Sequence, residues 1–134
     1  GRERAAFDLA GYIITSISDD PAQARDEARR QIAFYATAAT YDAILDLHGW
    51  QAQKDALRAA FRTFDIAGMQ AAITDDMVDQ IAITGTADEC RAGLAAYEGL
   101  LDHALFYPPS LGVRHERLLE NYARIREVFG PASA

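Results

Sequence analysis

Two segments of this chain have the composition of β-strands, and each leads directly into a helical pattern. They are Phe7 to Ser18 (FDLAGYIITSIS) and His103 to Tyr107 (HALFY). A strand that leads into a helix is the repeating unit of parallel α/β proteins. The long stretch between the two segments has a helical pattern, and no other segment resembles a sheet partner. Because a parallel sheet is buried on both faces and needs several strands, we expect the chain to be the closing portion of a larger barrel or open sheet.

Start and stop signals predict helices over most of the remaining chain. Asp20 and Pro21 are a typical helix cap and first helical residue, and Thr86 with Glu89 forms a capping box. Gly49 is typical of a left-handed helix end, and we expect Gly68 to interrupt the third helix. The predicted helices cover residues 21–38, 40–48, 51–67, 74–81, 86–100 and 113–129.

Composition excludes several classes of protein. The chain has 134 residues, a 50% hydrophobic content and a net charge of −7, which argue for one folded domain and against nucleic-acid binding. Since no apolar run approaches the length of a membrane span, we expect no membrane partner. The single Cys90 leaves no internal disulfide and favours a cytoplasmic location. His, Cys, Asp and Glu residues show no spacing typical of metal ligands, and we expect no metal site.

Several of these segments together resemble one known family. They are Ala10-Gly11-Tyr12-Ile13, Ser18-Asp19-Asp20-Pro21-Ala22-Gln23-Ala24-Arg25, Gln31-Ile32-Ala33-Phe34-Tyr35, Gly85-Thr86-Ala87-Asp88-Glu89-Cys90 and Ala104-Leu105-Phe106-Tyr107-Pro108-Pro109. In this order and spacing they resemble the C-terminal part of the luciferase-like monooxygenases, bacterial-luciferase-type barrels that use the deazaflavin F420 or flavin. The resemblance extends from about Ala5 to Gly130.

The resemblance implies an α/β fold, the C-terminal portion of a (β/α)8 barrel that is rich in helix and has about two short parallel strands. Residues 1–134 would then form a single segment containing barrel strand 7, a helical insertion, helix 7, strand 8 and helix 8. The first six strands, which supply most of the family's cofactor cradle, are absent from the chain. We therefore expect the isolated chain to be inactive alone, and its exposed barrel surfaces to favour self-association.

By the same resemblance, the intact enzyme would transfer a hydride between reduced F420, or alternatively flavin mononucleotide (FMN), and a small organic substrate. Redox chemistry then belongs to the cofactor, and no protein residue is expected to be catalytic. The alternative is a stand-alone helical module for binding or dimerisation, without catalysis. The helical majority and the lack of a catalytic constellation favour that alternative, and the two strands argue against it.

Four residues are candidates for lining a cofactor or substrate pocket: Ser16, His48, Trp50 and Tyr107. Ser16 and Tyr107 stand near the carboxyl ends of the two strands, where barrel enzymes place their active sites. His48 and Trp50 flank a helix end in the insertion and could cover a cofactor ring. The alternatives are that Ser16 satisfies local backbone groups, and that Trp50 is a buried anchor with His48 at a helix end. Tyr35 and Tyr41 present the same choice between pocket and core.

Overall fold

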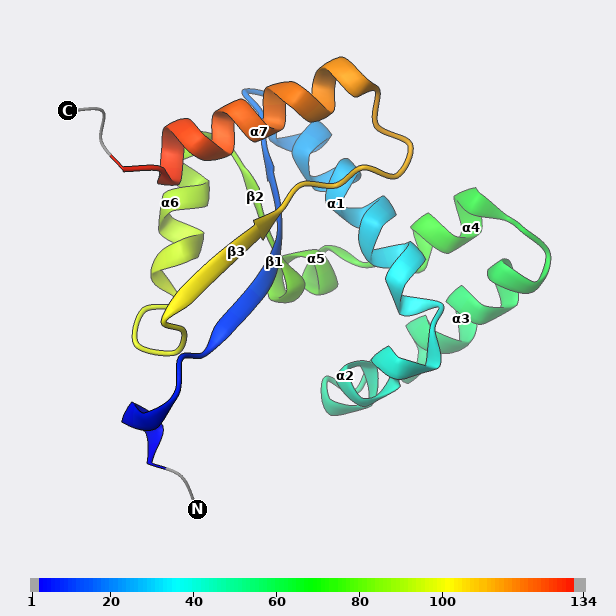
Figure 1. The fold of residues 1–134 in the computed structure, drawn as a ribbon. Coiled ribbons are helices and arrows are strands. Elements are labelled where there is room, and N and C mark those ends of the chain that lie inside the picture. The colour runs from blue at the N-terminus through cyan, green and yellow to red at the C-terminus, as the bar shows by residue number, and fades with distance from the viewer. Residues whose placement is uncertain (1–2, 132–134) are drawn as a thin grey trace.

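The computed structural model describes residues 3–131, and its centre is a parallel sheet of three strands (Figure 1). The strands are β1 (Ala10–Ile17), β2 (Ala82–Gly85) and β3 (His103–Tyr107), and their spatial order is β2-β1-β3. The first half of β1, up to Ile14, pairs with β3, and the second half, from Ile14 onward, pairs with β2. The long central strand therefore has a different partner at each end. The predicted α/β class is confirmed.

The sequence predicted about two parallel strands, and the structure adds a third, β2, which was not foreseen. Its four residues, Ala82 to Gly85, lie between helix α5 (Asp75–Ile81) and helix α6 (Ala87–Ala95). A strand this short has no periodicity that separates it from the end of the preceding helix. It forms because it can add to the exposed edge of β1, where Ile17 pairs with Gly85 and the amide of Ser18 donates to the Gly85 carbonyl at 2.9 Å.

Helices surround the sheet and extend to one side of it (Figure 1). The remaining elements are η1 (Arg4–Ala6), α1 (Pro21–Ala36), η2 (Ala39–Tyr41), α2 (Asp42–Leu47), α3 (Gln51–Arg62), α4 (Ile66–Ala71) and α7 (His115–Phe129). Helices α2, α3 and α4 form a helical lobe that lies away from α6 and α7. Among the described residues, no helix is long and apolar enough to cross a membrane.

The local signals that start and end the helices are largely those expected from the sequence. The side chain of Asp20 accepts bonds from the amides of Ala22 and Gln23, and Thr86 forms its capping box with Glu89. The predicted helix 51–67 is instead two helices, and the break is not at Gly68. It falls near Phe64, which has a left-handed φ of 54°, and Gly68 lies inside α4.

The two faces of the sheet are buried by different helices. On one face, Ile13 and Ile17 of β1 and Ile83 of β2 pack with residues of α6 and α7. On the other face, Ile14 and Ala82 pack against the core that α1, α5 and the helical lobe share. This alternation follows from the period of two along a strand, which sends successive side chains to opposite faces.

Beyond the end of β3, a side chain of α7 forms hydrogen bonds with the edge of β1 that β3 does not cover. Beyond Ile14, β1 has no strand on the β3 side among the described residues. There the Asn121 side chain accepts a hydrogen bond from the Ile17 amide at 2.9 Å and donates one to the Thr15 carbonyl at 3.1 Å. One carboxamide thus replaces the donor and the acceptor of a missing neighbouring residue, and it keeps two buried backbone groups paired.

Candidate functional site

An apolar cleft lies between the sheet and the helices that cover its second face. It has a volume of about 450 Å³ and is bordered by β1, α1, α2 and the last residue of β3. We call it the tyrosine cleft, and its lining residues are Tyr12, Ile14, Ile32, Tyr35, Ala36, Tyr41, Ile44, Leu45, Ile81 and Tyr107. The size and the apolar lining are typical of sites for small organic molecules.

Four tyrosines give the cleft its polar atoms. The ring of Tyr35 lies 5.8 Å from that of Tyr41 and 6.1 Å from that of Tyr107, measured between centroids. Tyr12 stands on the sheet and is 81% exposed, so its ring is open to any molecule that enters. The neighbouring Tyr107 hydroxyl and then burial raise the pKa of Tyr35 to about 12. Tyr35 is therefore a neutral hydrogen-bonding group throughout the physiological pH range.

The position of Tyr107 depends on a contact from α1. The side-chain oxygen of Gln31 accepts hydrogen bonds from the amides of Ser110 and Leu111, at 3.1 and 3.3 Å. Gln31 is buried, and it lies one helical turn before Tyr35 on the same helix. These bonds hold the segment that follows β3 against α1, so that Tyr107 and Tyr35 face each other.

A buried ionic network joins α1, β1 and α7 next to this contact. The Nε of Arg117 donates to Glu27 at 2.9 Å, and its Nη2 donates to the same carboxylate at 3.1 Å and to the Ile17 carbonyl at 2.8 Å. The hydroxyl of Ser16 donates to Glu27 at 2.6 Å. Glu27 is 2% exposed and Arg117 is 7% exposed, so both charges are taken out of water together.

The structure places the predicted pocket residues in three different surroundings. Only Tyr107 lines the tyrosine cleft. Ser16 is fully buried and bonds to Glu27, in the network described above. Its pocket role stays a prediction, and the structure gives it a side-chain partner rather than the backbone partner considered as an alternative.

His48 and Trp50 lie together in the helical lobe. Their rings stack at 4.3 Å between centroids, and the indole Nε1 donates to Asp76 at 3.0 Å. Trp50 is 6% exposed and belongs to the core between α1 and the lobe, whereas His48 is exposed. Neither lines the tyrosine cleft. Their proposed role over a cofactor ring stays a prediction that the geometry does not support.

Several residues of the site were not singled out from the sequence. Glu27 and Gln31 stand one turn apart beside the apolar stripe of α1, and both are buried. Polar residues at this spacing on the covered side of a helix predict buried partners, and the partners here come from the C-terminal part of the chain. Tyr35 and Tyr41, considered as pocket or core, line the tyrosine cleft.

Two further kinds of chemistry find no place among the described residues. Cys90 is buried, and burial, with a smaller contribution from Glu89, raises the pKa of its thiol to about 11. A thiol with such a pKa is a poor nucleophile. No group of three or more His, Cys, Asp or Glu residues within residues 3–131 is arranged to hold a metal ion.

Comparison with known proteins gives one family. The profile of the family described as luciferase-like monooxygenase matches residues 1–104. A 5,10-methylenetetrahydromethanopterin reductase of Archaeoglobus fulgidus is 35% identical over 94 residues, which are 66% of this chain and 28% of the relative. A reductase of the same name from Methanolobus tindarius is 34% identical over 94 residues, which are 69% of this chain and 28% of the relative.

An uncharacterised protein of Mycobacterium tuberculosis is also similar. It is 29% identical over 109 residues, which are 78% of this chain and 32% of the relative. The chain thus spans less than a third of the length of these curated relatives.

Proposed function

Because the chain belongs to the luciferase-like monooxygenase family, whose members are oxidoreductases, we propose that it is the C-terminal part of an enzyme that transfers a hydride between reduced F420 and an organic substrate. FMN is the alternative cofactor. Two relatives are reductases by name, which supports a reduction rather than a hydrolysis.

The observation that carries the proposal is the place of the tyrosine cleft. In this account β1 is the seventh barrel strand and β3 the eighth, and the two pair in parallel; β2 takes the other edge of β1, which strand six would occupy in a complete barrel. Tyr12 and Ile14 of β1 and Tyr107 of β3 lie on the same face of the sheet, which the C-terminal half of α1 and helix α2 cover. Tyr107 is the last residue of β3, and barrel enzymes place their active sites at the carboxyl ends of the strands.

The residues present suit one part of the cofactor. A cleft of about 450 Å³ with four tyrosines has the size and aromatic lining to receive a planar ring. No basic side chain lines the cleft, so a phosphate of F420 or FMN would be held outside it. We therefore propose that this segment forms one wall of the site that binds the cofactor ring.

The contribution of these residues to catalysis is orientation and exclusion of water. When bound, the cofactor supplies the hydride chemistry. Tyr12, Tyr35 and Tyr107 would hold the ring by contact with their own rings. Ile14 and Ile32 keep the cleft apolar, which excludes water that would compete with the tyrosine hydroxyls for hydrogen bonds.

A fluorescence titration of this chain with F420 and with FMN tests the proposal. We expect micromolar binding of F420 and weaker binding of FMN. Stronger binding of FMN would reverse the choice of cofactor. If a folded sample bound neither, the stand-alone helical module would become the better account of this chain.

A further inference from the structure

The outer edge of strand β3 is complementary to itself. Among residues 3–131, β3 pairs only with β1, so the backbone on its other side has no strand partner. We propose that a second copy of this chain binds there, with the two β3 strands antiparallel and a twofold axis at Leu105. Two sheets of three strands would then form one sheet of six. The inference concerns the partner of this chain and does not depend on the proposed cofactor.

Of the two edge strands, β3 is the accessible one. Three of the four residues of β2 are buried, because α1, α5 and α6 pack around that strand. No residue of β3 is buried, and Leu105 is 40% exposed. Its partner on β1, Tyr12, is exposed as well, so an apolar surface lies beside the open edge. An edge of this kind, without lysine or proline in the strand, favours pairing with another strand.

The backbone of β3 determines which residues can pair across this edge. The amide of His103 donates to the Leu9 carbonyl at 3.2 Å, so His103 directs its backbone groups to β1. Because this direction alternates along a strand, Ala104 and Phe106 present theirs to the open edge. With the axis at Leu105, Ala104 lies opposite Phe106 of the second copy. Each such pair exchanges both of its backbone hydrogen bonds, as antiparallel strands require.

The length of β3 selects the same register. Pro108 and Pro109 follow the strand directly and have no amide hydrogen, so pairing ends at Tyr107. The register centred on Leu105 is the one that pairs the whole of His103–Tyr107. It makes the two Leu105 residues a non-hydrogen-bonded pair, whose Cα atoms are typically about 4.5 Å apart. The two leucine side chains would therefore cover each other at the axis.

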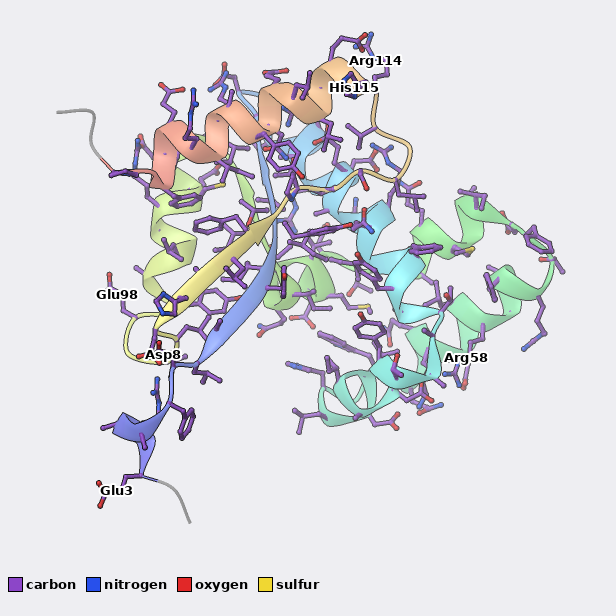
Figure 2. All side chains as sticks on the ribbon, in the orientation of Figure 1. Glu3, Asp8, Arg58, Glu98, Arg114 and His115 are labelled. Carbon is purple, nitrogen blue, oxygen red and sulfur yellow. The ribbon has the colours of Figure 1, made fainter. Side chains whose placement is uncertain are left out.

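The charges at the amino end of β3 favour the antiparallel arrangement over a parallel one. Figure 2 shows Asp8 and Glu98 near this end, and Asp8 lies 3.5 Å from His103. Arg4, at the same end, is already paired with Asp102. Parallel strands would bring the carboxylates of both copies together, which is destabilising. Antiparallel strands place the two acidic groups at opposite ends of the interface.

Cysteine cross-linking tests both the partner and the register. Leu105→Cys places two thiols at the axis, within the Cα separation of about 4.4–6.8 Å that a disulfide requires. His103→Cys and Tyr107→Cys test the register, since residue 103 of one copy should lie opposite residue 107 of the other. The control is Leu119→Cys, at an exposed position of α7. The native Cys90 is buried and stays in every variant, and circular dichroism would verify folding.

At about 0.1 mM protein with oxidised glutathione, we expect Leu105→Cys to form a disulfide dimer at least about tenfold faster than Leu119→Cys, because paired strands give the thiols an effective concentration in the millimolar range. His103→Cys alone should match the control, since antiparallel pairing separates the two copies of residue 103 by roughly 13 Å. A mixture of His103→Cys and Tyr107→Cys should form the mixed dimer. Non-reducing electrophoresis measures each product.

Equal rates for Leu105→Cys and Leu119→Cys would overturn the proposal, even if sedimentation showed a dimer, because the copies would then meet at another surface. Rapid cross-linking of His103→Cys with itself would also overturn it, since that product indicates parallel strands. Neither result changes the expected binding of F420, so this proposal and the proposed function fail separately.

Discussion

At the scale of single residues, the pair of Glu27 and Arg117 connects the two ends of the chain. The two side chains belong to α1 and α7 and form a bidentate ion pair that is almost completely buried. Ser16 and the Ile17 carbonyl supply further bonds, so the end of β1 is included in the same network. A network of this kind holds the helix that carries Tyr35 in one position on the sheet.

Removing Arg117 should therefore be strongly destabilising. Arg117→Met keeps the apolar stem but leaves the carboxylate of Glu27 buried without its partner, which typically costs about 3–5 kcal/mol. Urea unfolding would measure the loss. Arg124→Met is the matched control, because Arg124 pairs with the exposed Asp19 at the surface of the same helix, and little change is expected there. Equal stabilities of the two variants would contradict the account.

The tyrosine cleft should give an unusual alkaline titration. The pKa of Tyr35 is raised to about 12 from its ordinary value of 10.0, so the folded protein favours the protonated phenol. This contribution to stability is fully present below pH 10 and is lost as the pH rises through about 12. Tyrosinate absorbance should show a late-titrating tyrosine that disappears in Tyr35→Phe. Titration of all six tyrosines near pH 10 in a folded sample would be inconsistent with the cleft.

At the scale of elements, the Asn121 side chain of α7 makes the hydrogen bonds to β1 that a neighbouring strand would otherwise make. Asn121→Ala would leave the amide of Ile17 and the carbonyl of Thr15 without this partner in a buried position. We expect a loss of about 1–3 kcal/mol in unfolding free energy, measured by urea denaturation. The control is Glu127→Ala, at an exposed position of the same helix. A loss no larger than that of the control would show that water satisfies the two backbone groups instead.

The elements also show which parts of the fold could be read from the sequence. Helix starts such as Asp20-Pro21 and Thr86 were predictable, because the bonds that make them are local. The strand β2 was not, because Ala82 to Gly85 becomes a strand only through pairing with the distant β1. The break near Phe64 was missed for another reason: a left-handed conformation is expected at glycine, and Gly68 was the nearest one.

The candidate site was harder to predict than the fold. Tyr107 could be placed at the strand end by its sequence position alone. The other cleft residues could not, because Tyr12, Tyr35 and Tyr41 come together only when α1 covers the sheet. The burial of Ser16 likewise depends on Glu27 and Arg117, which lie far apart in the sequence.

At the scale of the whole molecule, the sheet has open edges. Within residues 3–131, β3 and β2 each pair only with β1, so each has one edge without a strand. Leu105 of the edge strand β3 is exposed, and so is its partner Tyr12 on β1. Unpaired edges next to apolar surface favour pairing with another chain.

We therefore predict that the isolated chain associates with itself. Sedimentation velocity should show a mean mass that rises with protein concentration, and Leu105→Lys should reduce that rise by placing a charge beside the open edge. The control is Leu119→Lys on the outer side of α7, where Leu119 is exposed and no sheet edge is present. A monomer at every concentration up to the solubility limit would contradict this prediction.

The most direct test of the central claim is to locate F420 on this chain by nuclear magnetic resonance. Amide shifts would be followed in an isotope-labelled sample as F420 is added. We predict changes at residues 12–14, 32–36, 41–45 and 107, which border the tyrosine cleft, and none on the outer side of α7. Changes confined to α6 and α7, or no change in a folded sample at saturating cofactor, would show that the tyrosine cleft is not the site.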